Sequence, residues 1–125
     1  MHKYKFGKDK RIRANNRFRE IIAGKFCICT DDVIIFALKN ELGYSRAGIS
    51  VGKKFGGAVM RNSLKRLLRE AFRLTCDIPA GYDFVLMYNS KLADLTRNQN
   101  RSVPFAQVKQ SFELAIAKLN KRLQQ

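Results

Sequence analysis

Residues 51–73 read VGKKFGGAVMRNSLKRLLREAFR, a glycine-rich approach that runs into a stretch with helical periodicity. Its apolar residues recur at three- and four-residue spacing, and at about 100° per residue they share one side of a helix. They are Leu64, Leu67, Leu68, Ala71 and Phe72. The spacing predicts a helix from about Asn62 to Thr75 that packs this side against a core.

The other side of this predicted helix is cationic. Its members, within an arc of about 100°, are Asn62, Lys65, Arg66, Arg69 and Arg73, with Arg61 at the edge and Glu70 outside both sets. Like charges at i and i+4 repel by roughly 0.2–0.5 kcal/mol per pair. Lys65, Arg69 and Arg73 are expected to have no intrahelical relief from this repulsion. Solvated faces usually mix their charges, so we interpret this face as a phosphate-binding surface, which suits the two-pronged guanidinium group.

The glycine-rich approach invites comparison with nucleotide-binding loops. A Walker loop requires Lys and then Ser or Thr after its last glycine, whereas Ala58 and Val59 follow Gly57 here. We therefore interpret the glycines as a tight crossover. Lys53 and Lys54 remain able to contact phosphate.

The rest of the chain predicts one α+β domain around this helix. In chain order the expected elements are a helix from Asn15 or Asn16 to Gly24, strands at 25–30, 33–38 and 46–51, the helix at 62–75, a strand at 82–88 and a helix at 105–123. We expect the first three strands to form an antiparallel meander and the fourth to lie parallel to the third. Gly24 is expected to end the first helix in a left-handed conformation. The result is a four-stranded mixed sheet packed with three helices, in the order α-β-β-β-α-β-α.

The net charge of +15 calls for a polyanionic partner. No apolar run approaches the roughly 18 residues of a spanning helix, so we expect a cytoplasmic protein that binds nucleic acid rather than membrane. Residues 1–14 are strongly basic and are predicted to be a flexible arm.

Three cysteines, Cys27, Cys29 and Cys76, are an odd number for a disulfide framework. Zinc would need a fourth ligand, for which the sequence offers only His2. We expect buried, inert cysteines and no protein-bound metal.

Residues 51–73 closely resemble the signature of the bacterial ribonuclease P protein family. The resemblance implies a fold like that of a ribosomal-protein domain, with a left-handed crossover between the parallel strands. It assigns binding of the catalytic RNA subunit to Lys53, Lys54, Arg61, Asn62, Lys65, Arg66, Arg69 and Arg73. The chain departs from the family at Ser63, where the motif usually has Arg.

The resemblance also implies a cleft for the single-stranded 5′ leader of precursor tRNA, between the first helix and the sheet. Phe18 and Phe36 match its aromatic positions, and Ile22 stands where the family often has an aromatic residue. Bases that stack on such rings gain roughly 1–3 kcal/mol each. The pattern alone favours core positions for these three residues, and only the resemblance assigns them to the leader.

The family implies that Mg²⁺ ions held mainly by the RNA subunit carry the phosphodiester hydrolysis, with one protein monomer per RNA and no catalytic residue in this chain. Two alternatives stay open. A ribosomal or other structural RNA-binding protein would share the charge, and an autonomous nuclease would have to use scattered acids such as Asp31 and Asp32.

Overall fold

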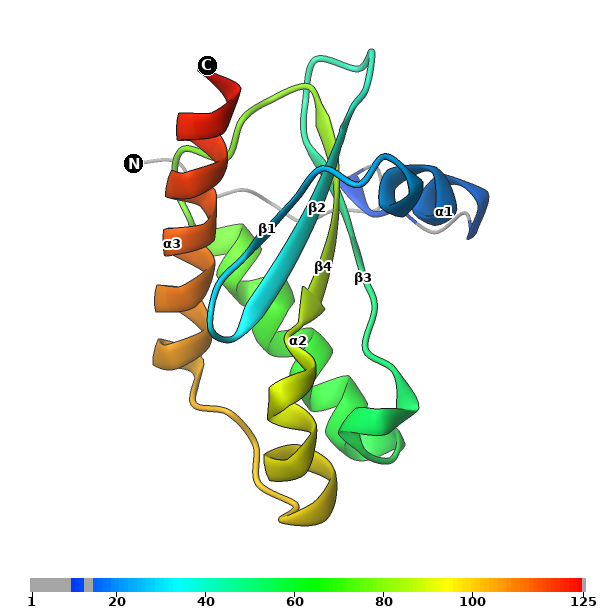
Figure 1. Ribbon diagram of the computed structural model, residues 1–125, viewed down its shortest axis with the longest axis vertical. Helices are drawn as coiled ribbons and strands as arrows, with labels where there is room; N and C mark the ends of the chain where they lie inside the picture. The colour runs from blue at the N-terminus through cyan, green and yellow to red at the C-terminus, as the bar shows by residue number, and fades with distance from the viewer. Residues whose placement is uncertain (1–9, 13–14, 125) are drawn as a thin grey trace.

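The computed structural model describes residues 10–12 and 15–124, whose arrangement Figure 1 shows. The helices are α1 (Asn15–Ala23), α2 (Ala58–Leu74) and α3 (Phe105–Leu123). The strands are β1 (Cys27–Cys29), β2 (Val33–Lys39), β3 (Arg46–Ile49) and β4 (Tyr82–Tyr88). This order confirms the predicted α+β fold with its α-β-β-β-α-β-α sequence of elements.

The sheet has the strand order β1-β2-β4-β3. The antiparallel pairing of β1 with β2 is confirmed, but β3 does not pair with β2, so the predicted three-strand meander is wrong. β4 inserts between β2 and β3, antiparallel to the first and parallel to the second. The reason is burial: residues 83–86 of β4 are buried on both faces, which suits a central position, whereas β3 is short and partly exposed. The parallel pairing of β3 with β4 is confirmed. The left-handed sense of the α2 crossover stays a prediction.

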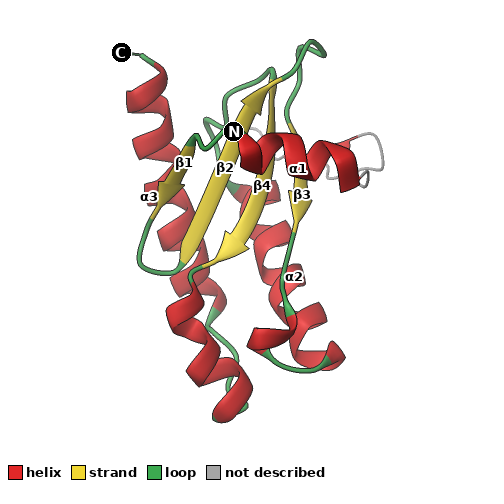
Figure 2. Ribbon diagram, turned by 45° about the vertical axis from the view of Figure 1, so that its right-hand side comes forward, coloured by secondary structure: helices red, strands yellow, loops and turns green. Residues whose placement is uncertain are grey.

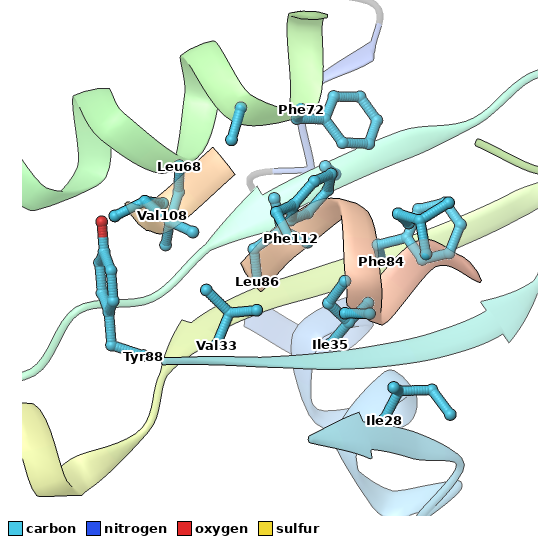
Figure 3. Close-up of a cluster of buried hydrophobic side chains, with 14 of the residues drawn as sticks. Ile28, Val33, Ile35, Leu68, Phe72, Phe84, Leu86, Tyr88, Val108 and Phe112 are labelled. Atoms are coloured by element: carbon cyan, nitrogen blue, oxygen red, sulfur yellow. The ribbon is translucent and has the colours of Figure 1, made fainter. Parts of the chain in front are cut away.

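One face of the sheet packs against α2 and α3 and forms the main core (Figure 3). Phe72 of α2 meets Phe84 of β4 and Phe112 of α3 edge to face, with ring centroids 6.3 Å apart in both pairs. Tyr88 Oη donates a 2.7 Å hydrogen bond to the Leu64 carbonyl oxygen. Burial, and then the Asp32 charge, raise the pKa of Tyr88, so its phenol is a neutral donor at pH 7. α2 is thereby tied to β4.

The other face of the sheet carries α1, which Figure 2 shows crossing the strands on the side away from α2 and α3. Ile21 of α1, Val85 of β4 and Ile12 form a second, smaller core. Ile12 belongs to the segment 10–12, where Arg11 bridges to Ala47 of β3. This part of the predicted flexible arm is therefore fixed to the sheet, and residues 1–9 and 13–14 lie outside the described residues.

Several local expectations differ from the structure. α2 begins at Ala58 rather than near Asn62, and the extended Gly57 is its N-cap residue. The left-handed residue after α1 is Lys25, with φ of 58°, and not Gly24. Residues 89–102, expected to lack an element, contain a 3-10 helix (Ser90–Leu92) and a π-helical turn (Asp94–Asn98). Buried Leu92 and Thr96 anchor these turns to the core.

The cysteines contradict the expectation of burial. Cys29 and Cys76 are exposed and Cys27 is partly buried. In β1 the alternation of a strand turns Ile28 into the core, which sends both neighbouring thiols to the opposite face. Within residues 10–12 and 15–124, no helix combines the length and apolar character that a membrane span requires.

Candidate RNA-binding surfaces

The first surface is the cationic face of α2 together with the 3-10 turn Lys53–Phe55 before it. The predicted apolar side is buried at Leu64, Leu68, Ala71 and Phe72, and Leu67 is half-buried against the same core. The predicted cationic side faces solvent to varying degrees. Lys53, Lys54, Asn62 and Arg66 are exposed, and Arg61, Lys65, Arg69 and Arg73 are partly exposed.

Most of these cations have no anionic partner within the described part of the chain. The six without one are Lys53, Lys54, Arg61, Lys65, Arg66 and Arg69. The buried Nε of Arg61 also lacks a hydrogen-bond acceptor among the residues that the structure describes. A buried donor without an acceptor costs roughly 1–3 kcal/mol, and a phosphate oxygen reaches this one only after the Arg61 side chain moves.

Arg73 differs from the expectation that the cations of this face only repel one another, because it has an anionic partner. Its Nε and Nη2 donate to the two carboxylate oxygens of Glu70 at 2.8 and 3.0 Å. The hydrogen bond from Arg73 lowers the pKa of Glu70, which stays charged at pH 7. By its angle around the helix, Glu70 was expected to lie outside the cationic arc. Side chains at i and i+3 are nevertheless neighbours on a helix, so Glu70 reaches Arg73. The unpaired cationic face, named from here the α2 face, therefore comprises the six cations above and ends at Arg69.

A pocket of about 200 Å³ links the α2 face to the rest of the molecule. Lys65 and Arg69 line it from α2, Gly48 and Ile49 from β3, and Arg11 from the N-terminal segment. The cations of α2 thus reach the edge strand of the sheet. Gly48 also lies directly beneath the Phe18 ring of α1, so this pocket borders the surface that carries Phe18.

The second surface is the one where the family resemblance places the leader cleft; we call it the aromatic cleft and define it by Phe18 of α1 and Phe36 of β2. Both partly buried rings pack against the small core of Ile12, Ile21 and Val85. The structure therefore brings these two predicted leader residues together. Ile22 is 40% exposed on α1 and lies outside that core. It is thus not a core residue, although its sequence pattern favoured that assignment.

Gly48 is the residue of the cleft that sequence reasoning missed. A Cβ added there would lie 2.2 Å from Phe18 Cζ, closer than real Cβ atoms approach. The Phe18 ring lies on the strand only because this position has no side chain. A glycine within a strand is the sequence signal for such an approach.

A buried ionic network holds α1 over the sheet. The fully buried Asp83 carboxylate accepts hydrogen bonds from Arg17 Nε at 2.7 Å, Arg46 Nη2 at 2.6 Å and Asn40 Nδ2 at 2.8 Å. Burial would raise the pKa of Asp83, but the hydrogen bonds from Arg46, Asn40 and Arg17 outweigh it and lower the pKa. Because Arg17 is one residue from Phe18, this network positions the aromatic cleft.

The two adjacent acids, Asp31 and Asp32, hold a turn of the fold in place. Asp32 is buried, and both of its carboxylate oxygens accept from Gln107 Nε2 at 3.2 Å. Exposed Asp31 lies 3.7 Å from Lys91 Nζ. The two acids thus anchor the β1–β2 turn to α3 and to the segment after β4.

The family model described as Ribonuclease P matches residues 6–120, a span that includes the α2 face and the aromatic cleft. The chain belongs to the ribonuclease P protein family. The ribonuclease P protein component of Clostridioides difficile is 38% identical over 93 residues, covering 73% of this chain and 82% of that protein. The component from Petrotoga mobilis is 29% identical over 115 residues, covering 91% and 94%.

Solved ribonuclease P proteins share the fold as well. The protein from Thermotoga maritima superposes with a TM-score of 0.73 at 34% identity, covering 86% of this chain and 96% of that one. The family predicted from residues 51–73 is therefore confirmed. The individual RNA contacts stay predictions.

Proposed function

We propose that this chain is the RNA-binding protein subunit of ribonuclease P and that it assists a catalytic RNA in removing the 5′ leader from precursor tRNA. The observation that carries the proposal is the α2 face, a row of cations without anionic partners in the described chain. Cations so arranged replace the counterions condensed on an RNA backbone, which supplies affinity that falls as salt rises. This surface binds the RNA subunit, as one protein monomer per RNA.

The aromatic cleft binds the leader in this proposal. Phe18 and Phe36 are half-buried, so each ring keeps a surface on which a base can stack. Exposed Ile22 adds apolar contact one turn away. Mature tRNA lacks the leader, so the cleft favours precursor over product. Bacterial tRNA precursors are made in the cytoplasm, which is where this function places the protein.

Mg²⁺ ions in the RNA subunit supply the hydrolytic chemistry, by activating water and stabilising the leaving oxygen. This chain's buried carboxylates do not fit a magnesium site, because Asp83 is held by two arginines and an asparagine and Asp32 by Gln107. The contribution of the protein is affinity and position. By screening phosphates it also lowers the magnesium that RNA folding requires.

Reconstitution tests the proposal. Precursor tRNA is mixed with a bacterial ribonuclease P RNA at low Mg²⁺, with and without the protein, and 5′ processing is followed. We expect processing with both components and none with the protein alone. Cleavage by the purified protein would support an autonomous nuclease, and co-purification with ribosomal RNA instead of ribonuclease P RNA would support a ribosomal role.

A further inference from the structure

A third basic surface lies on the opposite edge of the sheet from the α2 face. An open groove of about 290 Å³ runs between edge strand β1 and the C-terminal part of α3. It is lined by Cys27, Ile28, Cys29, Lys118, Lys121 and Arg122. Three of these side chains are cations, and the described lining contains no carboxylate. We call it the β1–α3 groove; no residue so far assigned to RNA binding lines it.

The groove lies beside the aromatic cleft, around the edge of the sheet that β1 forms. Cys27 of β1 pairs directly with Phe36 of β2, so both side chains lie on the same face of the sheet. Neighbouring strands are only about 4.8 Å apart, which places the groove one strand beyond the Phe36 ring. A chain that leaves Phe36 across β1 therefore enters the β1–α3 groove.

The cations of the groove have no anionic partner in the described chain. Lys118 and Lys121 are exposed and form no ion pair with any described carboxylate. Arg122 is held in place, since its Nη1 donates to the Cys27 carbonyl oxygen at 3.1 Å and its guanidinium carbon lies 4.9 Å from the Phe26 ring centroid. The helix dipole favours cations in the last turn of α3 but does not account for Lys118, more than one turn from the end.

The Cys27 thiol that lines the groove is neutral. Burial, and then the neighbouring Cys29, raise the pKa of Cys27, so this thiol stays protonated at pH 7. The neutral Cys27 sulfur offers an apolar surface to a nucleobase, and the lysines offer charge to its phosphate. Single-strand sites combine a cationic groove that follows the backbone with aromatic rings on which bases stack; the groove supplies the first part and the aromatic cleft the second.

We propose that the β1–α3 groove extends the leader-binding site, with the leader segment beyond Phe36 crossing β1 and its phosphates bound by Lys118 and Lys121. The inference rests on the proposed function of the aromatic cleft. Compact single-strand-binding domains of the OB fold take roughly 4–16 nucleotides each, more than two aromatic rings accommodate. Short leaders end in the aromatic cleft, and longer leaders reach the groove.

The experiment compares leader lengths in the reconstituted complex. The variant Lys118→Gln/Lys121→Gln keeps the helix propensity of α3, since Gln and Lys are similar helix formers. Its control, Lys91→Gln/Lys109→Gln, loses the same two charges at positions ion-paired with Asp31 and Glu113. Affinity is measured for precursor tRNA with leaders of about three and about ten nucleotides, lengths below and within the range of a single-strand site.

We expect the groove variant to lose about 10-fold in affinity for the long leader at 0.15 M salt. Each of the two lost phosphate contacts lowers the slope of log affinity against log salt by about 0.7. Affinity for the short leader should not change, and the control should behave as wild type with both. Equal losses for both leaders would assign the groove to the RNA subunit, and no loss would remove it from RNA binding. Each of these results overturns the extension. If wild type fails to prefer any precursor over mature tRNA, the proposed function itself fails.

Thiol protection supplies a second measurement without substitution. A long leader should slow alkylation of Cys27 and Cys29 by N-ethylmaleimide, and a short leader should not. Exposed Cys76, in the loop after α2, is the internal control for reagent activity. Equal alkylation of the β1 thiols with short and long leaders would contradict the path across β1.

Discussion

Substitution of Gly48 by alanine tests how the aromatic cleft is built. The new Cβ would lie 2.2 Å from Cζ and within 2.9 Å of both Cε atoms of Phe18, so the ring must leave its place on β3. Overpacking of this kind costs roughly 1–3 kcal/mol. Replacing glycine returns about 0.4–1 kcal/mol through the unfolded chain, so we expect a net loss of about 1–2 kcal/mol.

A double-mutant cycle with Phe18→Ala isolates the contact. Without the ring, Gly48→Ala should be neutral or stabilising by about 0.4–1 kcal/mol. The coupling energy between the two positions should therefore equal the clash, roughly 1–3 kcal/mol. Gly52→Ala is the matched control, because Gly52 has an extended backbone and no atom within 4 Å of the added Cβ.

Urea unfolding of wild type, the two single variants and the double variant measures these free energies. Gly48→Ala should also bind the leader more weakly than wild type, because the displaced Phe18 ring no longer offers its stacking surface. A coupling energy near zero, with Gly48→Ala as stable as wild type, would show that Phe18 is not seated on β3.

Two further predictions concern charged side chains. Asp83→Asn should destabilise the fold by roughly 3 kcal/mol, the low end for removing one member of a buried ion pair, because Arg17 and Arg46 keep some solvent access. The folded-state pKa of Asp83 lies below its unfolded value, so its contribution is complete above about pH 4 and is lost as pH falls through the lowered pKa. Wild type should thus lose stability on acidification more steeply than Asp83→Asn in urea unfolding between about pH 5 and pH 2; parallel pH profiles would contradict this role. Arg73→Gln should reduce the salt slope of binding to the RNA subunit by less than Arg69→Gln, because Glu70 already partners Arg73. Equal reductions would place Arg73 in the α2 face.

The elements could be predicted because their signals are local. The periodicity of α2 and α3 and the apolar run of β4 are properties of neighbouring residues, and the bounds of β4 agree with the sequence reading. Strand order is not local. Whether β3 pairs with β2 or with β4 depends on which strand needs burial on both faces. The short loop of residues 40–45 between β2 and β3 favoured the simpler meander.

The candidate site likewise has a part that could be predicted from local sequence and a part that depends on tertiary contacts. The α2 face and the two aromatic positions follow from spacing and resemblance, whereas the network that positions them joins residues 17, 40, 46 and 83, which no sequence pattern links. Cys27 and Cys29 were expected in the core because free cysteine usually is, but the alternation of the edge strand decides their face. The expectation that Arg73 has no intrahelical partner was wrong, because the i, i+3 spacing of Glu70 was not considered; its contact with RNA stays a prediction.

Binding of the α2 face to folded RNA is best measured as the salt dependence of affinity for a bacterial ribonuclease P RNA. Arg66→Gln/Arg69→Gln should lower the slope of log affinity against log salt by about 1.8, which amounts to about 30-fold at 0.15 M salt. The control Lys91→Gln/Lys109→Gln carries the same net charge and should keep the slope of wild type. Equal slopes for all three proteins would mean that α2 does not hold the RNA.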